Sequence, residues 1–533
     1  MTSTTTIELA NAPATPLPEL SGSSSACSPQ PQQTVFLSET EQHEDLSRGK
    51  TVVVISSVTC ITGVSSLLAG IVTVCIPAMA RDVNLENNLL LWPSSVYALT
   101  CGCTLLLSGA MADLYGARQL YLLGCFFQSV FTLACGLART GIQLILFRAL
   151  AGVAISMCLP SAVSIITHAF PAGRRRNTAF ASMGGGQPIG FSIGLSIGGV
   201  FTDTIGWRWG FHIAAIINTV IFLVALKWLP GLGRREAVTW RRFRTEVDWI
   251  GAFLASGFLS MISYHGKLSL YDSIITDSTH EMKKAENIAL LVISASLTGA
   301  FVAWVERQER LGRPAIIPNS LWKNRSFSSI CLSVFMVWGA FNATEQLSSF
   351  YLQYVQRLSA TNTSVRFLPA PMGGVLASIV AGLVVHRVRA DLAILVAVAL
   401  SSLSPVLMAV ADPAWSYWLC VFWAMFMNAI GADMLFTISN LLITSLFPAR
   451  TQGVAGGVYN TIAQIGKSVG LASSGAIASA VTARSGVADK ASPAALLEGY
   501  RASYWYCLGL YGATLVVTIW GLRKIGKVGV KKE

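Results

Sequence analysis

Four ionisable side chains stand inside long apolar runs of the 533-residue sequence. They are Arg148, Glu345, Asp433 and Lys467. A charge at the centre of a bilayer costs roughly 2.5–3.5 kcal/mol on insertion scales, so such side chains face a protein interior or water and indicate a functional site. A carboxylic acid shielded from water can bind and release a proton near neutral pH. Glu345 and Asp433 are therefore candidates for proton transfer.

Three of the four residues also have a structural explanation. Glu345 belongs to the polar segment 342–346, and it lies near a membrane surface if its apolar run ends early. Arg148 could form a structural salt bridge, or it could hold a partner acid or an anionic substrate. Lys467 could pair with an acid, whereas Asp433 lies well clear of both ends of its run. We treat all four as proton-coupling or substrate-binding candidates.

The composition excludes several classes of protein. Apolar residues make up 53% of the chain and charged residues 12%, against about 25% charged residues in a typical soluble domain. A soluble enzyme, a coiled coil and a disulfide scaffold are excluded, and a polytopic membrane protein is indicated. The net charge of +12 is expected in cytoplasmic loops and does not indicate nucleic-acid binding.

Metal and nucleotide sites are not expected. No histidine or cysteine pair has the spacing of metal ligands. The tripeptide 466–468, Gly-Lys-Ser, lacks the earlier glycine and the preceding strand of a phosphate-binding loop. We therefore expect no metal, no cofactor and no nucleotide.

Fourteen apolar runs are long enough to cross a bilayer, which takes about 20 residues per helix. None shows the two-residue alternation of a membrane barrel, so the runs predict helices. They cover residues 52–79, 91–112, 119–138, 141–168, 178–200, 211–229, 249–267, 286–305, 327–350, 368–386, 391–411, 415–440, 453–480 and 503–522. The predicted fold class is an all-α polytopic membrane protein. The polar segment 1–50 predicts a disordered tail with no cleaved signal peptide.

The basic residues predict the orientation. If the N-terminus is cytoplasmic, the segments on its side of the membrane hold roughly twice as many Lys and Arg residues as the opposite side, as the positive-inside rule requires. Both termini are then inside. The sequon 362–364 lies outside, which makes Asn362 a glycosylation candidate. The plasma membrane is the expected location, with the vacuolar membrane as the alternative.

Two glycine-rich runs reveal an internal repeat. Gly190, Gly194 and Gly199 follow Pro171 with the same spacing, within one residue, as Gly466, Gly470 and Gly475 follow Pro448. The two runs are eight apart, so the first six and the last six look like two copies of one unit. The predicted domains are a tail at 1–50, bundles at 51–230 and 327–522, a basic linker with two inserted helices at 231–326, and a tail at 523–533. Parallel six-helix repeats are typical of transporters that bind substrate at mid-membrane between the halves.

Several motifs resemble those of the major facilitator superfamily. The segment 109–118 resembles the signature after the second helix, although Ala117 and Gln119 replace usual basic residues. The matching positions are Gly109, Asp113, Gly116 and Arg118. Arg148 with Gly152 resembles a second signature. A third resemblance is to the antiporter glycine motif. The matching glycines are Gly190, Gly194, Gly198 and Gly199, and Leu195 stands in place of the usual proline.

Segments 207–211 and 248–251 resemble marks of the fourteen-span drug:proton antiporter branch, and the chain resembles fungal efflux pumps for toxins and secondary metabolites. Leu68 stands where that branch often has an acid, so no proton site is expected in the first helix. The resemblance implies a secondary active transporter that exports a small organic compound by alternating access while protons enter. The proton gradient would be its energy source.

Other functions have less support. A proton-coupled uptake permease is the first alternative, and the glycine motif argues against it. A non-transporting membrane sensor would need a long signalling tail, and a membrane enzyme would need clustered His/Asp or Ser/His chemistry. Neither feature is found in the sequence.

The signature also has a physical interpretation. Asp113, at the cytoplasmic end of the second helix, can cap another helix N-terminus, which stabilises by roughly 0.3–1 kcal/mol. The repeat places the expected acceptor near residues 453–457, where the cap would latch the cytoplasmic gate. The alternative is a loop turn with solvated charges. The glycines permit close approach of helices, either for packing alone or for gating.

Overall fold

The computed structural model describes residues 47–86, 89–170, 174–230, 248–258, 261, 285–313, 317–384, 388–447 and 449–523. Both predicted tails, except for residues 47–50 and 523, lie outside the described residues, as does segment 231–247 of the predicted linker. The chain divides at residue 44 into two units, and all of the described residues belong to the larger unit, Asp45–Glu533.

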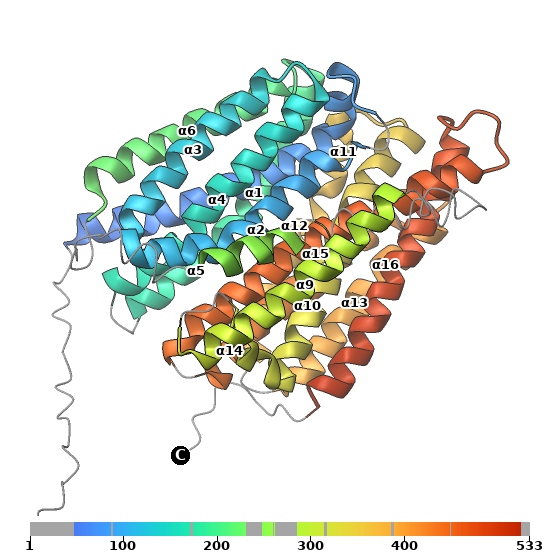
Figure 1. The fold of residues 1–533 in the computed structure, drawn as a ribbon. Helices are drawn as coiled ribbons and strands as arrows, with labels where there is room; N and C mark the ends of the chain where they lie inside the picture. Colours follow the sequence, from blue (N-terminus) through green and yellow to red (C-terminus); the bar gives the residue numbers. More distant parts are fainter. Residues whose placement is uncertain are drawn as a thin grey trace, which may run out of the picture. The chain divides into compact units, whose positions relative to one another are not determined.

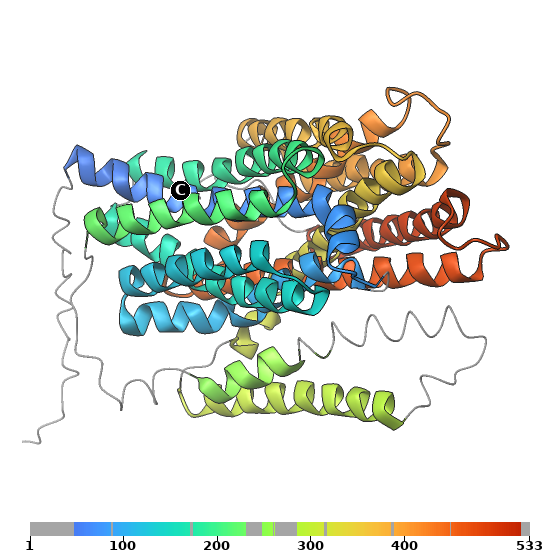
Figure 2. The same cartoon turned by 90° about the horizontal axis from the view of Figure 1, so that it is seen from above.

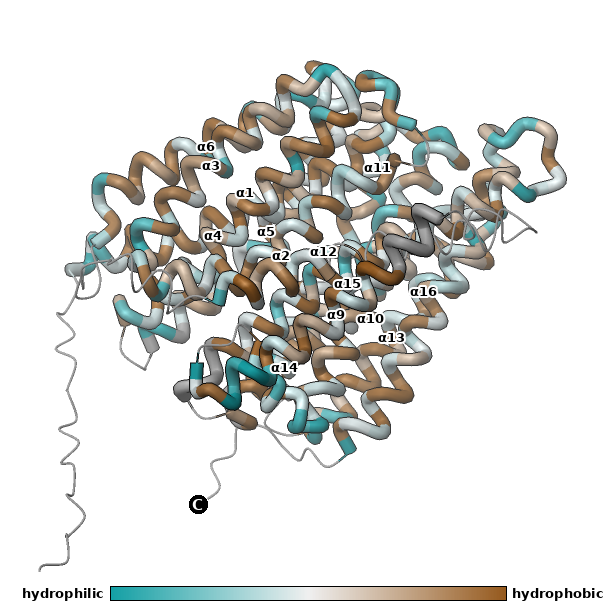
Figure 3. The backbone as a smooth tube through the Cα atoms, viewed as in Figure 1, coloured by the Kyte–Doolittle hydropathy of each residue, from teal (hydrophilic) through white to brown (hydrophobic). Residues whose placement is uncertain are grey.

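The regular structure of the described residues is helical throughout, which confirms the all-α fold class. The helices are α1 (Arg48–Asp82), α2 (Trp92–Tyr115), α3 (Ala117–Leu137), α4 (Gly141–Ala169), α5 (Arg174–Asp203), α6 (Arg208–Trp228), Trp249–Phe258, α9 (Ala285–Arg310), α10 (Arg325–Phe350), α11 (Ala360–Phe367), α12 (Pro369–Val384), α13 (Ala390–Val410), α14 (Val421–Leu446), α15 (Ala449–Arg484) and α16 (Pro493–Gly521). Each predicted apolar run coincides with a helix, and the run 249–267 is described only at 249–258 and 261. Ten helices of the described part are long and apolar enough to cross a membrane, and Figure 3 shows the hydrophobic colour along them.

Two helices differ clearly from the apolar pattern: α14 covers Val421–Leu446 where the run covers 415–440, and α16 begins earlier than its run. The last apolar run begins at residue 503, yet α16 begins at Pro493. The Ser492 side chain accepts a hydrogen bond from the Ala495 backbone N–H, and proline occupies the first helical position. A serine cap followed by proline is a strong helix start. The first turns of α16 are too polar to register as an apolar run.

The helices form two groups with the same internal pairing. In the first group α1 packs on α5 and α6, α2 on α4, and α3 on α4 and α6. In the second group α10 packs on α15 and α16, α12 on α14, and α13 on α14 and α16. Figure 1 shows the first group in blue to green and the second in yellow to red. Each pair in the second group corresponds to one in the first, shifted by the eight runs that the glycine spacing indicates.

Glycine explains how closely α5 packs on α1 and α15 on α10. A Cβ atom at Gly194 would collide with the Leu67 backbone of α1, and one at Gly470 would collide with the Gly339 backbone of α10. Gly190 and Gly466 make the equivalent contacts one turn earlier. Backbones approach this closely only where the residue has no side chain.

The third glycine of each series faces the opposite group. Gly199 of α5 lies against Ser364 and Ala360 of α11, and Gly475 of α15 lies against Leu91, just before α2. The repeated glycine spacing therefore specifies two contacts within each group and one contact between the groups.

The inserted helices pack on each other and on α2. Asp248 accepts hydrogen bonds from the Gly251 backbone N–H and the Trp304 indole N–H, both at 2.8 Å. The Ser256 hydroxyl donates to the Cys103 carbonyl of α2 at 3.0 Å. Figure 2 shows Trp249–Phe258 lying alongside α9. The segment 248–251 is thus a helix cap that joins the two inserted helices.

Candidate functional site

A small cavity lies between the two groups of helices. It is lined by Ala69, Thr73, Ser94, Tyr97, Arg148, Phe191, Asn342, Glu345, Gln346, Lys467 and Leu471, from α1, α2, α4, α5, α10 and α15. Its volume is about 20 Å³, and one water needs roughly 10–15 Å³ on this measure. Pockets for small organic ligands are roughly 300–1,000 Å³. The polar walls therefore lie close together around space for one or two waters.

Three of the four predicted ionisable residues line this cavity. Arg148 comes from α4, Glu345 from α10 and Lys467 from α15. The charge of Lys467 interacts with those of Glu345 and Arg148, and the charge of Glu345 also interacts with that of Asp433. The structure thus gathers residues that lie up to 319 positions apart in the sequence into one electrostatically linked cluster.

Arg148 is held by α2. Its side chain is 3% exposed, and its Nε atom donates to the Pro93 carbonyl at 2.9 Å. The guanidinium carbon lies 4.2 Å from the centre of the Tyr97 ring, a cation–π contact. The hydroxyl of Tyr97 shares a hydrogen bond of 2.8 Å with Ser65 of α1. One turn further on, Gly152 gives α4 the space to lie against the Tyr97 and Thr100 backbone region.

Glu345 and Lys467 have few partners within the described part of the chain. Glu345 is 5% exposed, and its Oε1 atom is buried without a hydrogen-bond partner. No carboxylate among the described residues lies within 4.0 Å of the Lys467 ammonium group. Charges in a low-dielectric interior are costly without partners, so these two groups are poised to respond to a ligand or a proton.

Asp433 lies beside the cavity and not in its wall. It belongs to α14, and its carboxylate sits directly against Gly374 of α12, where a Cβ atom would collide with it. Gly374 therefore creates the space that Asp433 occupies in the second group. Asp433 is close enough for its charge to act on Glu345.

A proline in α1 creates a contact with α10. Pro77 has no N–H, so the Thr73 carbonyl four residues earlier loses its helical donor. Gln346 and Ser349 of α10 donate to that carbonyl at 3.0 and 2.7 Å. Gln353 donates to the neighbouring Val74 carbonyl at 2.9 Å. The contact adjoins the cavity, because Thr73 and Gln346 also line it.

We call the end of the helices that carries Asp82 and Asp203 the Asp82 face, and the opposite end the Asp113 face. At the Asp82 face the two groups are joined. Asp203 of α5 accepts hydrogen bonds from the backbone N–H groups of Ala360 and Thr361, the first residues of α11, at 3.3 and 2.8 Å. The Ser364 hydroxyl donates to the Leu195 carbonyl at 2.7 Å.

At the Asp113 face, two glycines of α5 and one glycine of α15 have open space beside them. A Cβ atom at Gly184 or Gly185 of α5, or at Gly456 of α15, would meet no heavy atom within 4 Å. Contact between α2 and α15 continues as far as Leu106 and Gly457. The groups are therefore in contact at the Asp82 face, through α5 and α11, and along α2 and α15.

The signature segment lies at the Asp113 face. Gly109 packs against Pro160 of α4, and Gly116 has a φ of 94°, a conformation that favours glycine between α2 and α3. Arg118 donates to the Leu229 and Leu226 carbonyls at 2.8 and 2.9 Å, so it caps the end of α6. Asp113 is exposed and makes no hydrogen bond or ion pair within the described residues. The latch on α15 stays a prediction for another state.

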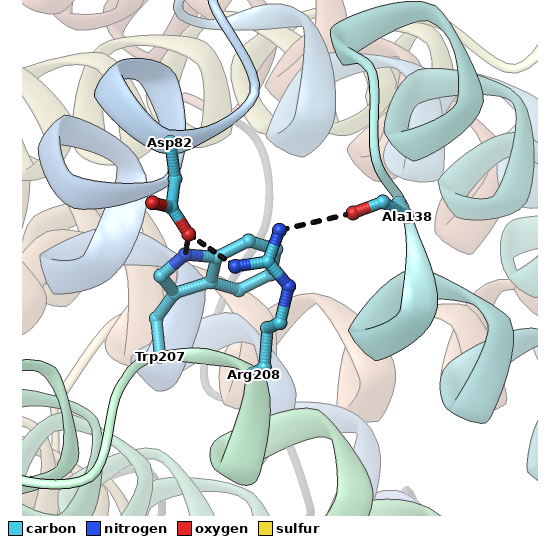
Figure 4. A network of polar contacts seen from close by, with 4 residues as sticks. All are labelled: Asp82, Ala138, Trp207 and Arg208. Carbon is cyan, nitrogen blue, oxygen red and sulfur yellow. Dashed lines mark hydrogen bonds and ion pairs between the residues drawn. The ribbon is translucent and has the colours of Figure 1, made fainter.

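A second polar network fastens the first group at the Asp82 face (Figure 4). The Trp207 indole N–H donates to Asp82 at 2.9 Å, and Arg208 forms an ion pair with the same carboxylate. Arg208 also donates to the Ala138 carbonyl at 3.2 Å. The network joins the ends of α1 and α3 to the start of α6. The tryptophan–arginine motif is thus structural in this chain.

Asn362 is exposed on α11 at the Asp82 face. Its sequon partners Thr363 and Ser364 are buried. Glycosylation of Asn362 stays a prediction, and a glycan there would lie beside the contact between α5 and α11.

Sequence reasoning missed three residues of this region. Tyr97 lies in an apolar run and carries no spacing signal. Asp203 lies at a helix end, and nothing in the sequence pairs it with α11. Thr73 could have been found, because a proline four residues later frees its carbonyl.

The all-α fold and the charged cavity between two repeated groups of helices define a polytopic membrane transporter. Residues 58–471 match the profile of the Major Facilitator Superfamily, and the chain belongs to that family. Members of this family are transporters and not enzymes.

Three curated relatives cover most of the chain. MFS-type transporter 1 of Pyricularia oryzae is 40% identical over 536 residues, covering 92% of this chain and 86% of the relative. Efflux pump terJ of Aspergillus terreus is 26% identical and covers 86% and 85%. Puromycin resistance protein pur8 of Streptomyces alboniger is 26% identical and covers 84% and 86%.

Solved structures share the fold. A bacterial homologue of the human lysosomal transporter Spinster, in an inward-facing and unoccupied conformation, matches with a TM-score of 0.62 at 16% identity and covers 90% of this chain and 99% of the other. The nucleoside transporter NupG matches with a TM-score of 0.58 at 11% identity, covering 87% and 99%. At this identity the likeness concerns the fold alone.

Proposed function

We propose that this transporter exports a small organic compound by alternating access and that protons move inward in exchange. The observation that carries the proposal is Glu345, a buried carboxylate with an unpartnered oxygen in a cavity between the two groups of helices. A site of this kind can exchange a proton for substrate contacts. Two relatives named as an efflux pump and a resistance protein support export, as does the resemblance to the drug:proton antiporter branch.

The proposed orientation places both termini in the cytoplasm of the plasma membrane. The Asp113 face carries Arg118, Arg175 and Arg176, and the positive-inside rule assigns such a face to the cytoplasm. The Asp82 face then points outward, and the contacts of Asp203 and Ser364 close the structure on that side. This is the state in which an exporter receives its substrate.

The proposed cycle uses the contacts between the groups. Substrate enters from the Asp113 face and binds between Glu345 and Lys467. The contacts of Asp203 at the Asp82 face and of Gln346 beside the cavity then break, and the Asp113 latch forms at the other side. A proton taken up from outside by Glu345, with Asp433 beside it, accompanies the return.

One observation favours proton-coupled uptake as the second candidate. Arg148 and Lys467 face the cavity with one carboxylate in its wall. A bound anion and a proton on Glu345 would each offset the charge that the other adds, so the two could travel in the same direction.

Metabolite analysis of cells and medium, with and without the gene in its own host, tests the direction. Export predicts a compound that accumulates in cells of the deletion strain and disappears from the medium. A compound that stays in the medium and is missing from the cells would establish uptake instead.

A further inference from the structure

The cavity contains more basic than acidic groups, and its basic groups have donors to spare. Arg148 uses Nε for the Pro93 carbonyl and rests its guanidinium on Tyr97. Its two Nη atoms have no hydrogen-bond partner among the described residues, and neither does the Lys467 ammonium group. The acidic side of the cavity is Glu345 alone, since Asp433 lies against Gly374 outside the wall.

The arrangement around Arg148 is preorganised. The Pro93 carbonyl and the Tyr97 ring fix the plane of the guanidinium, and Ser65 fixes the Tyr97 hydroxyl. A guanidinium held in this way presents its remaining N–H groups as a fork, which matches the two oxygens of a carboxylate. A lysine supplies a second, mobile positive charge without geometric demands.

The burial of Arg148 determines which ligand charge the cavity favours. Arg148 is 3% exposed, and a buried cation without a counter-ion is costly unless a ligand supplies the missing charge. Glu345 offsets one of the two positive charges, so a neutral compound would leave the other without a counter-charge, and a cationic compound would increase the excess. Only an anionic compound offsets the excess positive charge of the cavity.

We propose that the transported compound carries a carboxylate group and that Arg148 and Lys467 bind this group together. Glu345 and the amides of Asn342 and Gln346 contact the polar remainder of the compound. The inference rests on the proposed function only in taking this cavity as the transport site, and it holds for either direction of transport.

The first experiment uses the full-length protein purified in detergent. Metabolites extracted from the host are separated by ion exchange into acidic, neutral and basic fractions, and the melting temperature of the protein is measured with each fraction. The acidic fraction is expected to raise the melting temperature, and amidation of its carboxylates should remove the effect. Stabilisation by the neutral or basic fraction would overturn the proposal and leave the transport site intact. Stabilisation by none of them would overturn both.

Variants locate the binding groups. Arg148→Gln and Lys467→Gln should each weaken binding of the acidic fraction by about 10- to 100-fold, the loss expected for one charge-assisted contact. Lys467→Arg keeps the charge and should largely restore binding, which separates ligand contact from a folding defect. Arg484→Gln changes an exposed arginine at the end of the same helix as Lys467 and should have no effect. Unchanged binding in both cavity variants would refute the assignment.

Discussion

Asp203→Asn should weaken the closure of the two groups at the Asp82 face. Asp203 accepts two backbone hydrogen bonds at the start of α11, the shorter at 2.8 Å. A charge-assisted hydrogen bond contributes about 1.5–3 kcal/mol, and a negative charge at a helix N-terminus roughly 0.3–1 kcal/mol. Asp203 is exposed, and asparagine keeps one acceptor, so the lower end applies. The expected loss is about 1–2 kcal/mol, which shifts the equilibrium between closed and open states by a factor of roughly 5–30.

A distance measurement across the closed face checks this shift. Spin labels at positions 205 and 357 flank the contact between α5 and α11, and both native side chains are exposed. Cys60, the exposed native cysteine of the described part, is replaced by serine. The Asp203→Asn protein should show a larger long-distance population in pulsed electron resonance.

Asp412→Asn is the matched control for this measurement. Asp412 is an exposed acid at the same face, and its carboxylate accepts a hydrogen bond from the nearby Ala414 backbone N–H. It makes no contact with the first group among the described residues. Identical distance distributions for wild type and Asp203→Asn would show that the cap does not hold the groups together.

Further substitutions test the contacts that shape the site. Gly194→Ala should lower the melting temperature, since overpacking against the α1 backbone costs about 1–3 kcal/mol, whereas Gly509→Ala, at a position with open space, should not. Gln346→Ala removes a hydrogen bond to the Thr73 carbonyl and should favour opening of the Asp82 face. Adding Pro77→Ala should reduce that effect, because alanine restores a helical N–H donor to the Thr73 carbonyl. A double-mutant cycle with the same spin labels measures the coupling between the two substitutions. Asp248→Ala should cost about 1 kcal/mol because the helix cap and the acceptor of the Trp304 indole N–H are both lost, and unchanged Trp304 fluorescence and melting would contradict it.

Much of the fold follows from spacing that is visible in the sequence. Apolar runs of membrane length located the helices, and the repeated glycines predicted which helices are equivalent. The collisions that a side chain would cause at Gly194 and Gly470 give the physical reason, because helix pairs at backbone contact tolerate no other residue there. The start of α16 was not predicted, because the capped first turns of this helix are polar and give no apolar signal.

The candidate site was predictable in its charges and not in its contacts. Charges inside apolar runs must face the protein interior or water, so Arg148, Glu345 and Lys467 were each predicted as candidates, but their meeting in one cavity was not predicted. The stacking of Arg148 on Tyr97 and the cap of Asp203 on α11 depend on how distant helices meet. In the proposed alternating-access cycle the contacts between the groups change with the state of the transporter, so one sequence would encode more than one set of them. Asp113 illustrates this, since it has no described partner in the present state.

The most direct test of the account is proton-coupled transport by Glu345→Gln in liposomes, with the compound identified from the host. The wild-type protein should move this compound when a pH gradient is imposed. The variant should lose gradient-driven movement while it still exchanges labelled for unlabelled compound without a gradient. Glu498→Gln, which alters an exposed acid on α16, should behave as wild type, and Asp433→Asn shows whether the neighbouring acid shares the role. Gradient-driven transport at the wild-type rate by Glu345→Gln would contradict the central claim that this buried carboxylate couples protons to transport.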